Sequence, residues 1–509
     1  MVAAGMLAAI GNLSCQGKAD SPVKPNIVII LADDMGFGDV RSMNPKSRIP
    51  TPHIDALVHG GIAFTDAHAS ASVCTPSRYG LLTGRYAFRS EGAAYGIGGF
   101  DAPVIEPDRE TLASALRRSG YTTACIGKWH LGLGWTVKGD SVAVRFDPVS
   151  GRSNVDYTRE VTCGPNDFGF DYSFIHPASL DIPPYVFLRN HRVVDPQIVL
   201  TTDVYPSRLD KTVYAWDKKH TNEQAVYWEK GVWWRQGEMS ASFRVEECLP
   251  EIVREGLAFI GRQVKTEPQS PFFLYLPLTG PHTPWVPSER FRGQSDIGLY
   301  GDFVMEIDDI VGQVVQTLKE QGVYRNTILV FASDNGAYWP QEEVELHRHD
   351  SNEGRRGQKG DIHEGGHRIP LVVSWPDKVR KPVVYDGLVS LTDMMATLME
   401  LTGETLGGIP GEDSNSFAPV IKGIPGFTGR EHMVHHSSGG MFAIREGGWK
   451  YIDGLGSGGF TQPATGKPEP GGPAGQLYHL ETDSLEQHNL FMAGPEQIKR
   501  MKILLEDNN

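Results

Sequence analysis

Apolar runs rich in Val, Ile and Leu alternate with helical patterns along most of this chain. Such runs are typical of strands buried on both faces, and their alternation with helices predicts a large, mostly parallel α/β sheet flanked by helices. The expected strands are residues 26–32, 122–126, 272–276, 327–331 and 371–374. The expected helices are residues 111–119, 247–263, 302–321 and 392–402.

The composition changes after about Pro425. Residues 442–452 and 476–480 have the pattern of short antiparallel strands, and a loop rich in Gly and Pro lies between them at 454–475. We therefore divide the 509 residues into a tail (1–24), a large α/β domain (25–425) and a smaller α+β domain that contains a short antiparallel sheet (426–509).

Chemically capable side chains follow four of the expected strands. In open α/β sheets, ligands bind beyond the carboxyl ends of the strands, so we expect these side chains to converge on one site. One such ending could be a turn or a helix cap, but four together favour a shared site. The endings are Asp33-Asp34, Lys128 with His130, His282, and Asp334-Asn335.

The acidic strand ends predict a metal site. Asp33, Asp34, Asp334 and Asn335 offer only oxygen ligands, whereas a zinc site would call for Cys or His. Oxygen ligands suit calcium or magnesium, and three carboxylates with an amide overfill the small magnesium ion. The alternative is that the two pairs are unrelated helix caps, but both follow strongly apolar strands.

The segment CTPSRYGLLTGR, residues 74–85, has the pattern of a short helix. Pro76 suits its first turn and Gly84 suits its C-terminal end. Cys74 would then lie just before the helix, where the backbone N–H groups favour an anion, and Arg78 would lie one turn further on. A cysteine in this position could also be a reactive thiolate, which is the alternative chemistry.

These motifs resemble those of the type I sulfatases. The resemblance begins with C-x-P-S-R at 74–78 and L-x-T-G-R at 81–85. Further segments agree in order and type: LADDMGFGDV around Asp33, GKWHLG at 127–132, GPHTPW around His282, SDNG at 333–336 and RGQKGDIHEGGHRIP around Lys359. With the segments near Arg445 and Tyr478, the similarity covers nearly all of the chain after residue 25.

The resemblance implies an alkaline-phosphatase-like fold and one calcium ion. It also implies that a maturation enzyme oxidises Cys74 to formylglycine, whose hydrated aldehyde is the nucleophile in that family. The implied metal ligands are Asp33, Asp34, Asp334, Asn335 and the side chain at position 74.

The resemblance also assigns roles to the remaining residues. Arg78 helps to activate the nucleophile, and Lys128 and Lys359 hold the sulfate oxygens. His282 protonates the departing alcohol, a role that suits the pKa of histidine. His130 then takes the proton from the second hydroxyl of the hydrated aldehyde.

The charge balance limits the partners. A formal net charge of −14 argues against nucleic acid, and it requires a local positive pocket if the substrate is anionic. Two alternatives remain beside a sulfatase. One is a phosphate mono- or diester hydrolase of the same architecture, which would typically use Ser or Thr and zinc. The other is a non-catalytic relative that binds sulfated glycans, whose motif would be broken.

A sulfated carbohydrate is the expected substrate, with a galactose- or N-acetylgalactosamine-type sugar preferred. Such a sugar needs hydrogen-bond partners for its hydroxyls near the sulfate. The candidates are His176, Asp181 and His349, in segments similar to those of bacterial carbohydrate sulfatases. The alternatives are a turn cap for Asp181 and an exposed loop position for His349.

The apolar N-terminal stretch resembles the core of a secretory signal and is too short to span a membrane. We therefore expect an exported bacterial protein, periplasmic, extracellular or anchored as an outer-membrane lipoprotein through Cys15. No later segment has the pattern of a transmembrane helix. Pairing of Cys163 with Cys248 is left open by the sequence.

Overall fold

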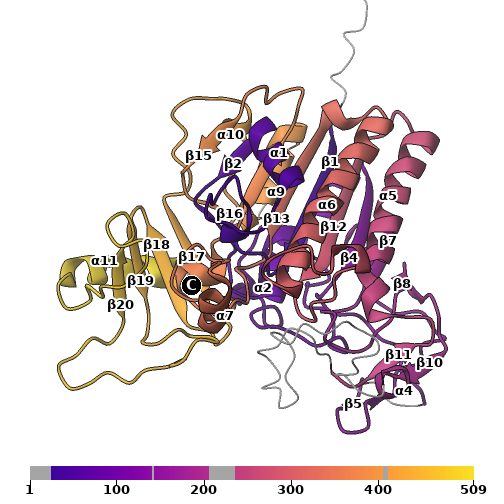
Figure 1. Ribbon diagram of the computed structural model, residues 1–509, viewed down its shortest axis with the longest axis horizontal. Coiled ribbons are helices and arrows are strands. Elements are labelled where there is room, and N and C mark those ends of the chain that lie inside the picture. Colours follow the sequence, from indigo (N-terminus) through magenta and orange to yellow (C-terminus); the bar gives the residue numbers. More distant parts are fainter. Residues whose placement is uncertain (1–23, 140–142, 206–234, 405–410, 509) are drawn as a thin grey trace, which may run out of the picture.

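A ten-stranded mixed sheet forms the centre of the large domain (Figure 1). The computed structural model describes residues 24–139, 143–205, 235–404 and 411–508. The strand order is β15 (Val383–Tyr385), β2 (Ile62–Phe64), β14 (Leu371–Ser374), β13 (Thr327–Ser333), β1 (Asn26–Asp33), β12 (Phe272–Pro281), β4 (Thr122–Lys128), β7 (Tyr172–His176), β8 (Leu188–Arg189) and β9 (Arg192–Val193).

The five strands β13, β1, β12, β4 and β7 are parallel neighbours. At the centre, Ile29 of β1 lies opposite Tyr275 of β12 on one side and Val330 of β13 on the other. The expected mostly parallel sheet is confirmed. The antiparallel pairs lie toward its edges, where β14 pairs with β13 and β8 pairs with β7.

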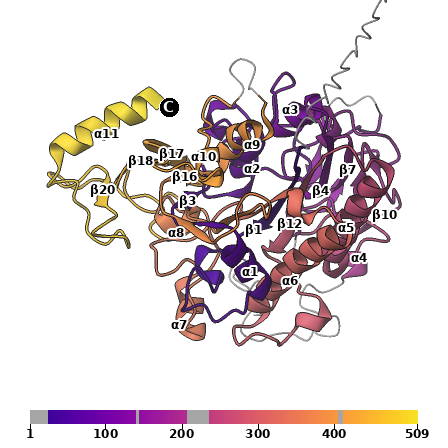
Figure 2. The ribbon, with the colours of Figure 1, turned by 90° about the horizontal axis from the view of Figure 1, so that it is seen from above.

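Helices cover both faces of this sheet, as Figure 2 shows from above. The apolar side chains on one face of β1 join a core with α1 (Pro52–Gly60), α5 (Cys248–Thr266) and α6 (Leu299–Glu320). Those on the other face join a core with α2 (Cys74–Thr83), α3 (Leu112–Arg118) and α9 (Met394–Thr402). Burial on both faces explains why the strands read as unbroken apolar runs.

Shorter elements complete the large domain. They are β3 (Ala67–His68), β5 (Phe146–Asp147), β6 (Arg152–Ser153), β10 (Ile198–Leu200), β11 (Glu238–Ser240), β16 (Val389–Ser390), α4 (Thr201–Val204), α7 (Gln341–His347), α8 (Glu364–His367) and α10 (Ala418–Ile421).

Several boundaries differ from the sequence-based expectation. Strand β12 continues five residues beyond Leu276, through two prolines, to Pro281, and its register with β1 shifts between Leu31 and Asp33. The sequence pattern missed β2 and β7, because three to five residues carry little periodic signal. Cys74 is the first residue of α2 rather than the residue before it, since Val73 is the N-cap.

A separate antiparallel sheet lies beside the large one, drawn in orange and yellow in Figure 1. Its strands, in order, are β17 (His432–His436), β18 (Phe442–Glu446), β19 (Trp449–Ile452) and β20 (Gln476–His479). Helix α11 (Pro495–Asn508) packs on it through Ile498, Met501 and Leu505. The expected C-terminal antiparallel sheet is confirmed, while the domain boundary at 425/426 stays a prediction.

The N-terminal tail, the cysteines and the lengths of the helices bear on three further expectations. Cys15 and the tail up to residue 23 lie outside the described residues. Cys163 and Cys248 are both free thiols, so they do not form the disulfide that the sequence left open. Among the described helices, none combines the length and the apolar composition that a membrane crossing needs.

A buried network of charges joins the two sheets. Lys450 of β19 donates to Glu364 of α8 (3.1 Å) and contacts Glu486 (2.9 Å), with all three side chains fully buried. Arg445 of β18 pairs with Asp66 of the large domain (2.8 Å). Although burial alone would raise it, the Lys450 ammonium holds the pKa of Glu364 well below its usual range. The pairs of Lys450 with Glu364 and of Arg445 with Asp66 therefore join the C-terminal sheet to the large domain.

Lys450→Met should lower the free energy of unfolding by about 3–5 kcal/mol, because it leaves the carboxylates of Glu364 and Glu486 buried without their ammonium. Urea denaturation followed by circular dichroism measures this loss. The control is Lys422→Met, which removes an ammonium from an exposed pair with Glu400 and should cost at most about 1 kcal/mol. Equal losses in both variants would contradict a role for Lys450 in joining the sheets.

Candidate active site

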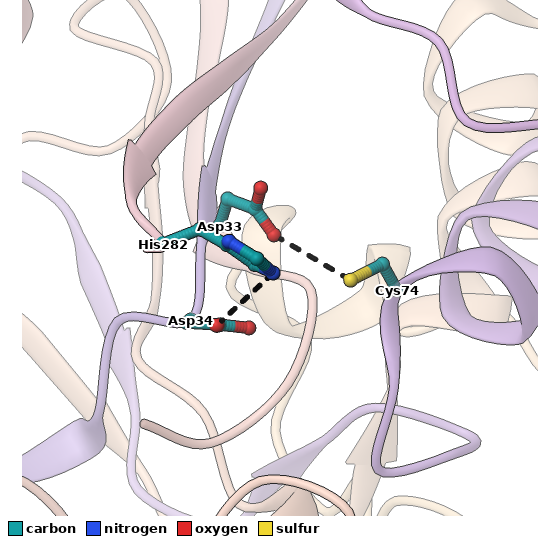
Figure 3. Close-up of side chains that lie close together, drawn as sticks. All are labelled: Asp33, Asp34, Cys74 and His282. Carbon is teal, nitrogen blue, oxygen red and sulfur yellow. Dashed lines mark hydrogen bonds and ion pairs between the residues drawn. The ribbon is translucent and has the colours of Figure 1, made fainter. Parts of the chain in front are cut away.

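The polar ends of four neighbouring parallel strands meet at one edge of the sheet. Asp33 ends β1, Lys128 ends β4, His282 follows β12 and Asp334 follows β13. The strands adjoin in the order β13, β1, β12, β4, so these side chains converge on one place. Figure 3 shows Asp33, Asp34 and His282 facing Cys74, with potential ligand atoms within 4.8 Å of one another.

Helix α2 brings Cys74 and Arg78 to the same place from the side. Gly84 ends this helix in the left-handed conformation at φ 64°, as its position in the sequence predicted. Cys74, in the first turn, donates its thiol hydrogen to Asp33 Oδ1 at 3.6 Å. One turn later, Arg78 donates to Asp334 Oδ2 through Nε (3.0 Å) and Nη2 (2.8 Å). The helix is thus fixed against the ends of β1 and β13.

Each carboxylate of the site has a different cation as its nearest partner, and Asp33 also lies 3.5 Å from Arg78. Lys128 Nζ donates to Asp33 Oδ2 at 2.6 Å, and Lys359 Nζ donates to Asp34 Oδ2 at 2.7 Å. Arg78 pairs with Asp334 as described above. Three buried negative charges therefore face three buried positive charges, and we call these six side chains the ion-pair cluster.

Burial and the neighbouring charges together set the pKa values of these groups. Burial would raise the pKa of Asp33, but the Lys128 ammonium and the other cations bring it below its usual value. Burial and the nearby Asp33 carboxylate raise the pKa of Asp334. Burial would lower the pKa of Lys359, yet Asp34 raises it, so this side chain stays positively charged.

The thiol of Cys74 is not activated. Burial raises its pKa to about 12, and the attraction of Lys128 and Lys359 does not offset this. An unmodified Cys74 is therefore a neutral thiol at neutral pH, and a neutral thiol is a poor nucleophile. This environment disfavours the alternative of a reactive thiolate, since burial outweighs the attraction of the two lysines.

The oxygen-rich half of the site has the chemistry of a cation site. Asn335 donates through Nδ2 to Asp34 Oδ1 (2.7 Å), which leaves its carbonyl oxygen Oδ1 buried without a hydrogen-bond partner among the described residues. Leaving such an acceptor unpaired costs about 1–3 kcal/mol. A hard divalent cation bound by Asp33, Asp34, Asp334 and Asn335 would be a partner for this unpaired oxygen. The residues present therefore fit a calcium or magnesium ion.

Two histidines line the site with defined tautomers. His130 Nε2 donates to the Ile97 carbonyl (2.8 Å), so Nδ1 is the unprotonated nitrogen, and it is buried without a partner in the described part of the chain. Burial, then Lys128, lowers the pKa of His130 well below its usual value. His282 Nδ1 donates to the Thr283 carbonyl (2.5 Å), and its Nε2 lies 3.6 Å from Asp34 Oδ2.

These groups open into a cavity of about 1400 Å³. Asp34, Cys74, His130, His282 and Lys359 are among the residues that line it. The cluster contributes Lys359 to the lining of this cavity, and Arg235, Arg355 and Arg356 line it from outside the cluster.

Of the three residues expected to bind a sugar, the structure brings Asp181 alone to the cavity. Asp181 Oδ1 lies 3.8 Å from His282 Nδ1, and its Oδ2 accepts a hydrogen bond from Arg235 (2.5 Å). His176 is fully buried, with its ring nitrogens near the carbonyls of Val186 and Ser179, and burial lowers its pKa to about 4.

The expected sugar contact at His349 is corrected by its surroundings. Its Nε2 lies 2.8 Å from Asp39 Oδ1, and its Nδ1 accepts from the backbone N–H of Arg48 (3.3 Å). The side chain is buried rather than exposed, so neither the sugar role nor the exposed loop position describes it. Both ring nitrogens are occupied inside the protein, and the residue supports the loop that follows β1.

Sequence reasoning missed Arg235. Arg235 lines the cavity and pairs with Asp181. In the sequence it follows a polar segment that has neither helical nor strand periodicity. A lone arginine in such a segment is usually a solvated surface charge, so the sequence offered no means of finding it.

Fold and site together define a large α/β protein with buried cations beside a cavity and a group of side chains that could hold a metal ion. The profile of the family described as "Sulfatase" matches residues 25–404. The chain belongs to the sulfatase family, and is therefore a sulfuric ester hydrolase.

Individual relatives agree with this assignment. The chain is 34% identical to N-acetylgalactosamine-6-O-sulfatase of Bacteroides thetaiotaomicron, over 95% of this chain and 93% of that protein. It is 28% identical to human steryl-sulfatase, over 84% and 75%. A solved Bacteroides thetaiotaomicron structure concerned with glycosaminoglycan metabolism superposes with a TM-score of 0.79 and 32% identity, over 95% of this chain and 99% of that one.

Proposed function

We propose that this chain removes O-sulfate groups from a sulfated carbohydrate, with a galactose- or N-acetylgalactosamine-type sugar as its substrate. The observation that carries this proposal is the ion-pair cluster around Cys74 at the base of the cavity. The similarity to an N-acetylgalactosamine-6-O-sulfatase over nearly the whole length of both proteins supports the choice of sugar.

Charge balance explains why this site suits a sulfate ester. The three carboxylates and three cations cancel, so a bound divalent cation would leave the site with two excess positive charges. A sulfate monoester carries one negative charge and free sulfate carries two. The cluster therefore attracts substrate and product locally, although the net charge of the chain repels anions at long range.

The proposed chemistry needs two groups that the amino-acid sequence does not itself encode. Formylglycine at position 74 supplies a hydrated aldehyde as the nucleophile, and a calcium ion supplies positive charge beside it. Calcium is the proposed cation because three carboxylates and an amide provide more oxygens than magnesium accommodates. A maturation enzyme that oxidises Cys74 is then a necessary partner.

The residues of the chain provide binding and proton transfer. A metal cation bound to Asp33 and Asp34 would replace Lys128 and Lys359 as the partners of these carboxylates. The two ammonium groups could then bind the sulfate oxygens. His282 points Nε2 toward Asp34 and the cavity, and when both of its ring nitrogens are protonated it can give the Nε2 proton to the departing sugar oxygen. His130 has its lone pair at Nδ1, and its lowered pKa keeps that nitrogen ready to accept a proton.

The family assignment disfavours both alternatives. A phosphate ester hydrolase would typically have Ser or Thr at position 74 and several nitrogen ligands for zinc, whereas position 74 is Cys and His282 is the one nitrogen donor beside the oxygens of Asp33 and Asp34. A non-catalytic glycan-binding relative would not need an unpaired histidine nitrogen beside residue 74. Export, with or without lipidation of Cys15, is proposed from the apolar N-terminal stretch.

Cys74→Ser should reduce release of sulfate by at least about 10³-fold, because serine supplies one hydroxyl where the chemistry needs two. The rate of sulfate release is measured with a chromogenic aryl sulfate and with a sulfated sugar as substrates. The control is Cys163→Ser, at a half-exposed cysteine outside the cavity, which should keep full activity. Near-normal turnover by Cys74→Ser would exclude the formylglycine mechanism.

Calcium added to metal-stripped protein should raise its melting temperature. At 100 times the dissociation constant, the stabilisation expected from binding is about 2.7 kcal/mol. Asp334→Asn should lose most of this shift, whereas Asp361→Asn should keep it, since Asp361 is a buried carboxylate that bonds a loop instead. No shift in the parent protein, or the same shift in both variants, would contradict the proposed calcium site.

Asp181→Ala should lower kcat/KM on a sulfated sugar by roughly 10- to 100-fold more than on a small aryl sulfate, which has no hydroxyls to lose. His349→Ala is the matched comparison, because this buried residue should affect both substrates equally. Equal losses on both substrates in Asp181→Ala would mean that Asp181 positions His282 rather than the sugar.

A further inference from the structure

An exposed aromatic ring lies next to the sulfate-binding end of the cavity. Phe460 is 44% exposed, lines the cavity and belongs to the Gly- and Pro-rich loop of the C-terminal sheet. Its ring lies on Gly360, where an added Cβ would come within 2.9 Å of the ring. Gly360 follows Lys359, whose ammonium contacts Asp34 of the ion-pair cluster.

The loop that carries Phe460 is fixed to the large domain. Ile362 donates its backbone N–H to the Ser457 carbonyl (2.8 Å). Asp361 accepts from the Thr461 backbone N–H (3.0 Å) and hydroxyl (2.5 Å). The ring is therefore held in one place while much of its apolar surface faces solvent, which is unfavourable unless a ligand covers it.

The surroundings of the ring are amides and hydroxyls. Gln358 has its side-chain oxygen buried without a hydrogen-bond partner among the described residues, and its Nε2 lies 3.5 Å from Thr461 Oγ1. Gln462 and Gln487 line the same part of the cavity. An aromatic face bordered by amides matches a sugar ring, which has a face of C–H groups and a rim of hydroxyls.

The volume of the cavity also exceeds the needs of one sugar. Pockets for small molecules usually measure about 300–1,000 Å³. The cavity here measures about 1400 Å³ and extends from Cys74 to the loop of Phe460 without interruption. A single sulfated sugar at residue 74 would leave part of this volume unfilled, and Phe460 borders the same cavity.

We propose that Phe460 and Gln358 form a second sugar subsite, which binds the unit next to the sulfated sugar in an oligosaccharide. The C–H face of this second sugar packs on Phe460, and its hydroxyls bond the side-chain amide of Gln358, which lines the cavity. Tyr338, at 6.3 Å and 76° to Phe460, supports the ring from its edge. The subsite rests on the proposed function, because it has a ligand only if the substrate is a carbohydrate.

The test compares kcat/KM on a sulfated monosaccharide with that on the matching sulfated disaccharide and trisaccharide. Phe460→Ala should lower kcat/KM on the longer substrates by about tenfold or more, the size of one lost aromatic contact, and leave the monosaccharide within about twofold. Phe460→Trp should restore the preference for longer substrates. Met492→Ala, at an exposed apolar residue outside the cavity, should affect all substrates equally.

The outcomes separate this proposal from the one on which it rests. If the parent protein cleaves aryl sulfate but no sulfated sugar, both proposals fail. If it cleaves sulfated sugars and Phe460→Ala changes all chain lengths equally, or none, the second subsite alone is overturned. A loss on a bulky apolar sulfate ester as large as on the trisaccharide would also overturn it, since the ring would then hold an apolar group.

Discussion

The ion-pair cluster is the constraint on which the rest of the site depends. Taking six charges out of water is costly, and the nearest cation to each carboxylate here comes from a different element. Arg78 links α2 to β13, Lys128 links β4 to β1, and Lys359 ties a long loop to the end of β1. The cost of burial is offset only when all these elements are in register, so the folded sheet and the assembled site require each other.

The C-terminal sheet completes the site from the opposite side. Lys450 and Arg445 fix it to the large domain through buried carboxylates, and its Gly- and Pro-rich loop lies against Gly360 beside Lys359. The lining of the cavity thus combines the charged Lys359 with Phe460 and nearby amides. One part handles a sulfate group, and the other offers a surface for the molecule to which the sulfate is attached.

Much of this arrangement follows from the sequence because β strands impose strong patterns. Doubly buried strands produce apolar runs, and the residues that end them, such as Asp33, Lys128 and Asp334, must lie at one edge of a parallel sheet. No such sequence pattern indicates the direction in which a loop side chain points. His349 lies in a polar segment before Lys359, yet it turns inward to Asp39, and Arg235 reaches the cavity without any signal in its neighbours.

The chemical state of residue 74 is the most direct test of the proposed formylglycine mechanism. Protein produced with and without a formylglycine-forming enzyme can be digested, and the peptide that contains residue 74 can be weighed by mass spectrometry after trapping of aldehydes. We predict that sulfatase activity is proportional to the aldehyde fraction, because burial leaves the unmodified thiol neutral, with a pKa of about 12. Full activity in protein that carries only the cysteine at position 74 would contradict it.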